Sequence, residues 1–469
     1  MKKPNLLFIF ADQWRRDAMG FMKKDEVITP NIDSFAEEAL SFDNAMSACP
    51  LCSPNRATMF TGKYPISHGV WTNCKNGLNN VFLKEEEITL MDVLKNNGYT
   101  TGYIGKWHLD LPESNLVENP KSGARDWDAY TPSGKKRHGV DYWYSYGAYD
   151  HHLEPHYWND SEEMIQVKQW SVEHETDRAL EFIDKNKENP FALIVSWNPP
   201  HTPLDLVPQK YVDIYAGKKF KVNPNVLLTD VTDHTESVNP RLNFTDDEYQ
   251  EIMRKYFAAV TGVDENFGRL LQKLKDDGLY DDTIIVLTAD HGELLCAHRL
   301  WSKHVWYEES VAVPFIIKYG DRYIKGRTES VLNGVDIMPT ILSLMGLPIP
   351  NTVEGVDLKE VILTGDKKEN YAILSAYPGQ VRAVKGFEEI GEKNIDYGWR
   401  AVRSERYTYV INRGYRLDYG VERLLYDNIA DPYQLNPVKI DKIEENPLAE
   451  KFEKILKEWA NKYQDNFKF

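Results

Sequence analysis

The chain has 469 residues, of which 42% are hydrophobic and 27% are charged, an ordinary balance for a folded globular protein. Its formal net charge of −16 argues against nucleic acid or an anionic membrane as a partner, because both require a basic surface. A site for an anionic substrate must therefore be locally positive against the field of the whole protein. The length predicts one large domain and a smaller one.

The first predicted element is a buried strand at Leu6–Ala11, which follows the basic residues Lys2 and Lys3. This apolar run is short, Asp12 ends it, and no small-residue cleavage site follows, so it does not fit a signal peptide. No stretch of the chain approaches the length of a transmembrane helix. We therefore expect a cytoplasmic protein, although an export signal trimmed from the chain would leave the same sequence.

Continuous apolar runs alternate with amphipathic segments along most of the chain. Such runs predict a mainly parallel β-sheet that is covered by helices on both faces, which is an α/β fold. The predicted strands are 6–11, 101–105, 191–197, 283–289 and 313–318, and the predicted helices are 31–40, 90–97, 172–186, 246–278 and 336–345.

Three regions depart from this alternation, among them the irregular stretch at 199–241, which we also expect to line the active site. Residues 110–169 are rich in aromatic residues, glycine, proline and histidine, and long loops of an α/β domain usually line its active site. The C-terminal part contains a charged, turn-rich stretch at 386–393, then short strand-like pieces at 399–402, 407–411 and 424–426, and a closing helix at 447–464. We therefore predict a catalytic domain over residues 1–365 and a smaller subdomain with a short antiparallel sheet over residues 366–469.

The most informative motif is Cys-Ser-Pro-Asn-Arg at residues 52–56. Pro54 is tolerated in the first turn of a helix and Gly62 provides a stop, so the motif predicts a helix that opens near Cys52. A cysteine there could be a thiolate nucleophile, a metal ligand or the precursor of a modified residue.

The other cysteines give weaker signals. Cys49 and Cys52 form a C-x-x-C pair, which leaves a redox or zinc interpretation open. Four cysteines are too few for a disulfide scaffold, and we favour small buried residues as the explanation of Cys49, Cys74 and Cys296.

Acidic residues follow two of the predicted strands. Asp12 and Gln13 follow the strand at 6–11, and Asp290 and His291 follow the strand at 283–289. A single aspartate after a strand is often only a helix cap. Two such places, one with an adjoining histidine, fit a divalent cation that is held mainly by oxygen ligands.

Lysines and histidines follow the same or other strands. Lys106 and His108 stand two residues apart on an extended segment and so point the same way, while His201 lies in an Asn-Pro-Pro-His segment after 191–197. Lys303 comes shortly after Asp290. Each of these could be an ordinary surface or packing residue, but the carboxyl ends of parallel strands meet at one edge of a sheet. The pattern therefore predicts a single catalytic centre.

Together these residues resemble the type I sulfatases, in which the cysteine of a C-x-P-x-R motif is oxidised after translation to formylglycine. The resemblance covers most of the chain and implies the α/β sandwich of the alkaline phosphatase superfamily and the hydrolysis of sulfate esters. The residues that carry it are Asp12, 52–62, 105–108, His201, Asp290, His291 and Lys303, and downstream 400–403, Tyr407, Tyr409, 425–427 and 431–432.

The resemblance also implies a metal and a modified residue. Formylglycine at position 52, present as a hydrate and made by a formylglycine-generating enzyme, would be the nucleophile. The cation, most often Ca²⁺ with Mg²⁺ or Mn²⁺ as alternatives, would be held by a hydrate oxygen at Cys52 and by Asp12, Asp290 and His291, with Gln13 as a candidate further ligand.

Roles for the remaining polar residues follow from the same resemblance. Arg56, Lys106 and Lys303 would neutralise the sulfate oxygens. His201 would protonate the departing alcohol oxygen, and His108 would take a proton from the second hydroxyl of the hydrate so that sulfate is expelled.

The substrate is expected to be a small or oligosaccharide sulfate ester, such as a glycosaminoglycan or mucin sugar. His151, His152 and His156 lie among aromatic and acidic residues, which suits recognition of sugar hydroxyls, although each could simply hydrogen-bond within its loop. One alternative is a phosphonate monoester hydrolase or phosphodiesterase of the same superfamily, and another is a non-catalytic protein that binds sulfated glycans. The Lys106 and His108 pair favours a sulfatase over the first, and the complete set of polar residues argues against the second.

Overall fold

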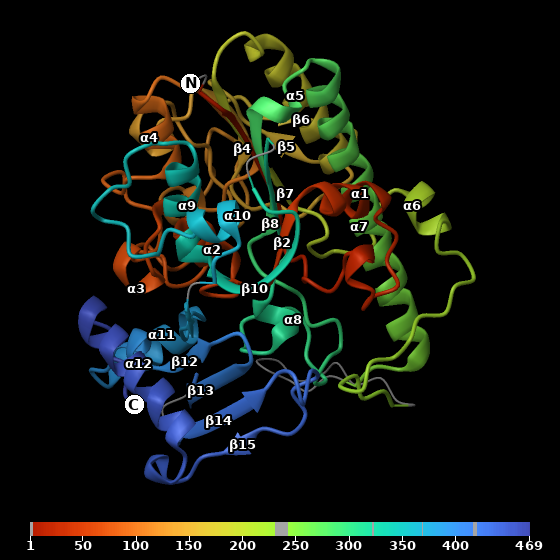
Figure 1. The fold of residues 1–469 in the computed structure, drawn as a ribbon. Helices are drawn as coiled ribbons and strands as arrows, with labels where there is room; N and C mark the ends of the chain where they lie inside the picture. Colours follow the sequence, from red (N-terminus) through yellow and green to blue (C-terminus); the bar gives the residue numbers. More distant parts are fainter. Residues whose placement is uncertain (1–2, 230–242, 321–322, 368, 416–419) are drawn as a thin grey trace.

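The central sheet contains eight strands among the residues that the structure describes (Figure 1). The structure is a computed structural model and describes residues 3–229, 243–320, 323–367, 369–415 and 420–469. In chain order the strands are β1 Asn5–Ala11, β2 Leu40–Met46, β3 Thr100–Lys106, β4 Tyr142–Tyr146, β7 Phe191–Trp197, β8 Thr283–Ala289, β9 Phe315–Tyr319 and β10 Gly326–Asn333. They lie in the order β10-β2-β9-β8-β1-β7-β3-β4.

The sheet is mainly parallel, as predicted, and all five predicted strands are present. β1 runs parallel to β7 and β8, with Phe8 opposite Ile194 on one side and Val286 on the other. β9 is the exception, because it pairs antiparallel with both β2 and β8. β1, β7 and β8 are buried along their whole length, which explains why the sequence shows them as continuous apolar runs.

Three strands of this sheet lie outside the predicted set because their sequences lack such a run. β2 is interrupted by Asp43 and Asn44, and β10 lies at an edge with its first half partly exposed. β4 is the opposite edge and falls within residues 110–169, where we expected only loops.

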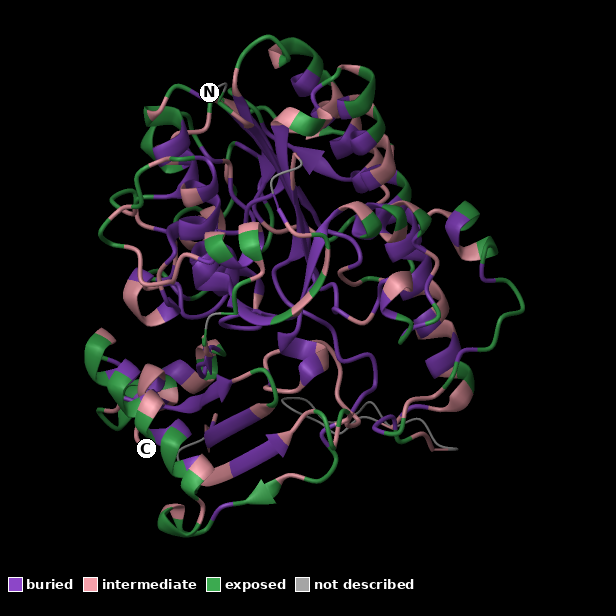
Figure 2. Ribbon diagram, in the orientation of Figure 1, coloured by how far each residue is buried: buried purple, intermediate pink, exposed green. Residues whose placement is uncertain are grey.

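Helices cover both faces of the sheet. Their bounds are α1 Pro30–Glu38, α2 Cys52–Thr61, α3 Pro65–His68, α4 Leu90–Asn96, α5 Ser171–Asn186, α6 Gln209–Asp213, α7 Asp246–Asp276, α8 Glu308–Val311, α9 Ile337–Leu344 and α10 Lys359–Thr364. On one face, α5 packs on β3, β7 and α7, and α7 also contacts α1 and α6 (Figure 1). On the other face, α2 contacts α4 and α9. Figure 2 shows the buried strands between these layers, whose outer surfaces are exposed.

All five predicted helices are present, although the first is shorter than expected because Leu40 begins β2. α7 begins with a capping box formed by Thr245 and Glu248, and its regular apolar spacing buries one face. Among the described residues, no helix is both long and apolar enough to span a membrane.

A second, smaller sheet of five antiparallel strands lies in the C-terminal part (Figure 1). Its strands are β11 Ala372–Ala376, β12 Gly398–Arg403, β13 Tyr407–Gly414, β14 Glu422–Asp427 and β15 Val438–Lys439, and α12 Pro447–Tyr463 packs on β12 and β13. This confirms the predicted antiparallel sheet and closing helix. The turn-rich prediction for 386–393 is wrong in its first half, because α11 Val381–Glu389 buries Val384 and Phe387. The domain boundary at 365 and 366 stays a prediction.

A buried carboxylate joins the two sheets. Glu308, at the start of α8, accepts hydrogen bonds from Arg16, in the loop after β1, at 3.0 Å and from Arg403, in β12, at 2.8 Å. Burial by itself would raise the pKa of Glu308, but Arg403 and Arg16 hold it at about 2. This pairing stabilises the contact between the loop after β1 and the small sheet.

We expect Glu308→Gln to lower the free energy of unfolding at pH 7 by about 3 kcal/mol, because two buried guanidinium groups lose a charged partner. The pKa of Glu308 is depressed in the folded state, so its contribution is present above the ordinary pKa of a glutamate and is lost as the pH falls toward 2. Urea unfolding at pH 7 and pH 3 measures this loss. Glu329→Gln, which breaks an exposed pair with Lys367, is the control, and equal stability of Glu308→Gln and the unmodified protein at pH 7 would contradict the expectation.

Candidate active site

Polar side chains gather at the carboxyl ends of four neighbouring strands. Asp12 follows β1, Asp290 and His291 follow β8, Lys106 ends β3, and Asn198 follows β7. These strands are adjacent in the order β8-β1-β7-β3. As predicted, the edge of one sheet therefore brings together residues that lie far apart in the sequence.

Helix α2 carries Cys52 at its first position and is buried along its whole length. It ends at Gly62, whose φ of 65° requires the left-handed conformation that glycine adopts without strain. The Asn55 side chain donates to the Asp290 carbonyl at 2.6 Å, and the Ser53 backbone N–H donates to the Asn73 side chain at 3.1 Å. These hydrogen bonds fix the first turn of the helix against the end of β8 and against the segment that carries Asn73.

Four potential metal ligands converge at Cys52. One atom from each of Asp12, Cys52, Asp290 and His291 lies within 4.8 Å of the others, and all four residues are buried. The Cys52 Sγ is 3.5 Å from Asp12 Oδ1 and 3.3 Å from His291 Nε2. Nδ1 of His291 donates a hydrogen bond to the Gly292 carbonyl at 2.9 Å. Nε2 therefore carries no proton and presents a lone pair to the other three ligands.

Arg56 holds the two carboxylates in place. Its Nη2 is 2.9 Å from Asp12 Oδ2, and its Nε is 2.9 Å from Asp290 Oδ2. Its Nη1 donates to the Lys106 carbonyl and to the Ser196 hydroxyl. Since most of its N–H groups are engaged by the protein, Arg56 positions the carboxylates, and its predicted contact with sulfate stays a prediction.

Lys106 adds a second buried cation. Its Nζ lies 2.8 Å from Asp12 Oδ2 and 3.0 Å from Asn198 Oδ1, with Asp150 at 3.9 Å. Burial alone would lower the pKa of Lys106, but Asp12 raises it above its ordinary value, so the ammonium group stays charged. Asn198 also donates to Asp150 at 2.9 Å.

The two carboxylates have opposite pKa shifts. Burial would raise the pKa of Asp12, but Lys106, His201 and Arg56 hold it well below its usual value. Burial and the neighbouring Asp12 raise the pKa of Asp290 to about 7. Two buried carboxylates beside a neutral imidazole nitrogen make a donor set that fits a divalent cation, since the cation would remove the need for a proton on Asp290.

The thiol of Cys52 is a poor nucleophile in this setting. Burial and the Asp12 charge raise its pKa to about 12, so the thiol is protonated at neutral pH. Cys49, Cys74 and Cys296 are buried and free, as predicted. Cys49 is not one of the four potential metal ligands found among the described residues.

His108 has one free ring nitrogen. Its Nε2 donates to the Cys74 carbonyl at 3.1 Å, which assigns the proton to Nε2. Its Nδ1 is buried without a hydrogen-bond partner among the described residues. Burial and the charges of Lys106 and Arg56 lower the pKa of His108 well below its usual value, so Nδ1 can accept a proton but does not hold one at rest.

His201 lies beside Asp150. Its Nδ1 donates to the Thr202 carbonyl at 2.6 Å and is 3.5 Å from Asp150 Oδ1, which leaves Nε2 for a substrate. Burial lowers the pKa of His201 to about 3; Asp150 opposes the shift, and Lys303 adds to it.

Lys303 reaches the site through Gln13. The Lys303 ammonium group donates to the Gln13 amide oxygen, and the Gln13 amide nitrogen donates to Glu293. The backbone N–H of Gln13 donates to Asp290 Oδ1 at 3.1 Å. Because its amide oxygen is bonded to Lys303, the ligand role of Gln13 stays a prediction.

The three loop histidines have different surroundings. His152 Nε2 contacts the His201 carbonyl at 2.9 Å, and it is buried. His156 is buried with its Nε2 2.5 Å from Asp128, while His151 is exposed. Their role in substrate binding stays a prediction, and His156 has the within-loop hydrogen bond that we considered as its simpler explanation.

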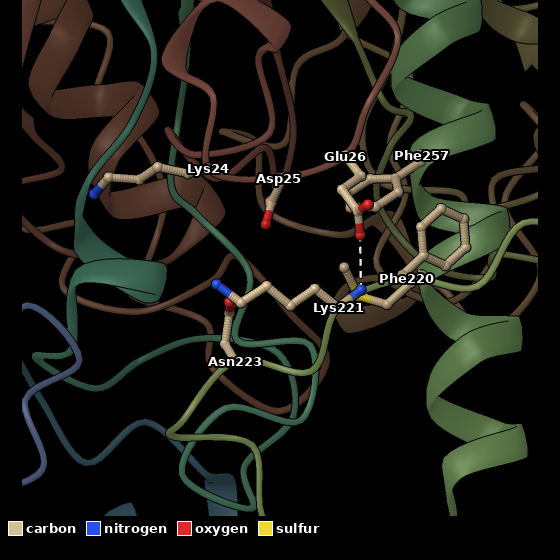
Figure 3. A pocket seen from close by; sticks show the side chains of 8 residues that line it. Lys24, Asp25, Glu26, Phe220, Lys221, Asn223 and Phe257 are labelled. Atoms are coloured by element: carbon tan, nitrogen blue, oxygen red, sulfur yellow. Dashed lines mark hydrogen bonds between the residues drawn. The ribbon is translucent and has the colours of Figure 1, made fainter.

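Buried charges also brace the loop that follows β1. Arg15 pairs with Asp25, with 2.7 Å between Nε and Oδ2, and its backbone N–H donates to the Tyr256 hydroxyl on α7. The Tyr256 hydroxyl donates to the Gln13 carbonyl. Asp25 also lines a small hollow together with residues such as Lys221 and Phe257 (Figure 3). The start of the loop is thus fixed relative to α7.

Three site residues were missed by the sequence reasoning. Asn198 directly follows a predicted strand, so the strand-end rule could have found it. Asp150 and Glu293 have no local signal, because their roles depend on partners far away in the chain: Lys106 and His201 for Asp150, and Gln13 for Glu293.

Known proteins match the chain over most of its length. It is 34% identical to an endo-4-O-sulfatase of Bacteroides thetaiotaomicron (94% of this chain, 89% of that protein). It is 35% identical to an ulvan-active sulfatase of Formosa agariphila (98% and 83%). A structure solved in work on the metabolism of multiple glycosaminoglycans by Bacteroides thetaiotaomicron superposes with a TM-score of 0.85 at 31% identity, covering 99% of this chain and 97% of that one.

A phosphonate monoester hydrolase of Silicibacter pomeroyi shares the fold, with a TM-score of 0.71 at 21% identity over 99% of this chain and 96% of that one. The model of the sulfatase family matches residues 4–347, and that of the C-terminal part of N-sulphoglucosamine sulphohydrolase matches residues 296–462. The chain belongs to the sulfatase family and has its α/β fold.

Proposed function

We propose that this sulfatase removes sulfate from sulfated carbohydrates, with formylglycine formed at Cys52 and a divalent cation as its reactive groups. The observation that carries the proposal is the position of Cys52. Its side chain lies within 3.5 Å of Asp12 and His291, at the start of a buried helix. Cationic side chains surround this point in a protein of net charge −16.

Asp12, Asp290 and His291 would hold the cation, together with an oxygen of the modified residue 52. Mainly oxygen donors suit a hard cation, and we propose Ca²⁺, with Mg²⁺ and Mn²⁺ as alternatives. Residue 52, once modified, would supply the nucleophilic oxygen, and a cation held by these residues would supply Lewis-acid activation. A formylglycine-generating enzyme would make the modification before the protein is active.

The lysines complement the charge of a sulfate ester. Lys106 is held charged by Asp12 at 2.8 Å, and Lys303 reaches the same region from the loop after β8. Fixed cations in a buried site stabilise the charge that develops on sulfate oxygens more than they would in water. Arg56 contributes indirectly, because it fixes the positions of the two carboxylates that face residue 52.

The two histidines are suited to opposite proton transfers. His201 presents Nε2 and has Asp150 behind its other nitrogen, so an approaching anion raises its pKa and favours a proton for the leaving alcohol oxygen. His108 presents an unprotonated and unpaired Nδ1, which can take a proton from the hydrate so that sulfate leaves.

The two alternatives have less support. The fold is shared with a phosphonate monoester hydrolase, but that match is weaker in identity and in superposition than the matches to the sulfatases. A binding protein without activity has no need of a buried carboxylate pair with a shifted pKa.

The modification at residue 52 can be tested directly. We expect mass spectrometry of active protein to find residue 52 as an aldehyde, and we expect Cys52→Ala to lower kcat on an aryl sulfate by at least about 10³-fold, because the nucleophile is lost. Cys52→Ser should retain bound sulfate after one turnover, because its ester cannot eliminate. Cys296→Ala removes another buried thiol and should keep full activity. Undiminished hydrolysis by protein with a free thiol at residue 52 contradicts the proposal.

Metal binding is expected to strengthen with pH. The pKa of Asp290 is about 7 in the metal-free protein, so a proton competes with the cation below pH 7. The apparent affinity should rise by about fivefold from pH 6 to pH 7 and by about twofold more from pH 7 to pH 8, and level off above that. Calorimetric titration of chelator-treated protein with Ca²⁺, Mg²⁺ and Mn²⁺ at pH 6, 7 and 8 measures this, with Asp290→Asn as the impaired variant and the exposed Asp213→Asn as the control. Affinity that is independent of pH counts against Asp290 as a ligand.

A substrate panel separates the candidate activities. We expect turnover of an aryl sulfate to exceed that of an aryl phosphodiester and a phenylphosphonate, and we expect sulfate release from at least one member of a set of monosulfated sugars. Aryl sulfate turnover without release from any sugar contradicts the carbohydrate assignment alone. Preference for the phosphodiester or the phosphonate contradicts the sulfatase assignment.

A further inference from the structure

Lys75 is a largely buried lysine without a counterion among the residues that the structure describes. Its side chain is only 8% exposed, and among the described residues no acceptor lies within hydrogen-bond distance of its ammonium group. Its contact is with the face of Trp127, whose ring centre is 5.8 Å from Nζ. Burial lowers the pKa of Lys75 to about 8, and no carboxylate opposes that shift. A cation on a largely buried side chain, with no partner from the protein, indicates a place where an anionic ligand can supply the partner.

The segment that carries Lys75 is hydrogen-bonded to residues of the candidate active site. The Ser53 hydroxyl accepts a hydrogen bond from the Cys74 backbone N–H at 3.1 Å, and the Cys74 carbonyl accepts one from His108 at 3.1 Å. The Lys75 carbonyl in turn accepts one from the Asn115 side chain at 3.1 Å. The backbone that carries Lys75 is therefore fixed to α2 and to His108.

Trp127 offers an open aromatic surface at the same place. It is 41% exposed, and its ring lies nearly parallel to that of His108, with 6.2 Å between centres and 23° between planes. A sugar ring can stack on such a surface while its polar groups point to neighbouring donors. The Trp127 ring thus lies between His108, a proposed catalytic residue, and the ammonium group of Lys75.

His304 supplies a neutral polar group beside Lys75. Its Nε2 is buried without a hydrogen-bond partner among the described residues. Burial lowers the pKa of His304 to about 3, and Lys75 and Lys303 add to this shift, so the ring is uncharged. The ring stacks on Tyr415, and the His304 carbonyl accepts hydrogen bonds from Tyr415 and Trp399 of the C-terminal part.

We propose that Lys75, with Trp127 and His304, forms a subsite that binds a second anionic group of the substrate, distinct from the sulfate that is removed. The inference rests on the proposed function, since it concerns the substrate of the same site. The chemistry fits a carboxylate of a uronic acid or a second sulfate ester, both of which present oxygens to a single ammonium group. The preferred substrates are then sulfated sugars that carry at least two negative charges, rather than singly charged sulfate esters.

The test compares matched substrates. One pair consists of a sulfated disaccharide with a uronic acid and the same disaccharide with the carboxyl group reduced to an alcohol. A second pair consists of a disulfated sugar and its monosulfated counterpart. We expect the unmodified protein to prefer the more anionic member of at least one pair by about 10- to 100-fold in kcat/KM, mainly through KM. The pair that shows the preference identifies the group as carboxylate or sulfate.

Variants of Lys75 test whether this residue causes the preference for the more anionic substrate. Lys75→Met should abolish most of it by raising KM for the more anionic member, and Lys75→Arg should restore much of it because the charge returns. Lys84→Met is the matched control, because Lys84 also rests on an aromatic ring, that of Phe82, at 3.5 Å; it should keep the preference. Lys75→Gln serves as a second variant if Lys75→Met does not fold.

Two results would overturn the subsite. One is equal kcat/KM of the unmodified protein for both members of each pair, and the other is loss by the same factor for both members in Lys75→Met and Lys75→Gln. Absence of sulfate release from every member, and from an aryl sulfate, overturns the proposed function and the subsite together. Sulfate release without discrimination overturns the subsite alone.

Discussion

The ion pairs of Arg56 are the interaction on which the site depends. Asp12 and Asp290 stand at the ends of adjacent strands and are completely buried, so their desolvation and mutual repulsion oppose folding. Arg56 offsets this because one guanidinium group reaches an oxygen of each carboxylate at 2.9 Å. The same contacts fix α2, and therefore Cys52, against β1 and β8.

This arrangement leaves specific atoms free for chemistry. Asp12 uses Oδ2 for Arg56 and Lys106, and its Oδ1 faces Cys52 and His291. Backbone carbonyls fix the ring protons of the histidines in a similar way, so that one nitrogen of each points to the reaction centre or is left without a partner. The protein is acidic overall, but the site is locally positive because Lys106 and Lys303 are held there. The overall composition does not reveal this local charge.

The small C-terminal sheet shapes one side of the site. Trp399 of this sheet and Tyr415, directly after β13, hold the segment that carries His304, and Arg403 holds Glu308. The loop between β8 and β9 is thus fixed from both sheets. Variation in the C-terminal part can therefore change the substrate side of the site while the carboxylates and α2 stay in place.

The sequence by itself determined the strands that are buried on both faces, because they must be continuous apolar runs, and the helices with regular apolar spacing and clear ends. It also determined the candidate site, since residues at the ends of parallel strands meet and the Cys52 motif is specific. Only the tertiary structure decided the direction of β9, the polar strands β2 and β10, and partners such as Asp150 and Glu293. Those features depend on contacts between segments that are far apart in the chain, and a local pattern of side chains carries no record of which distant group will neutralise a charge or complete a hydrogen bond.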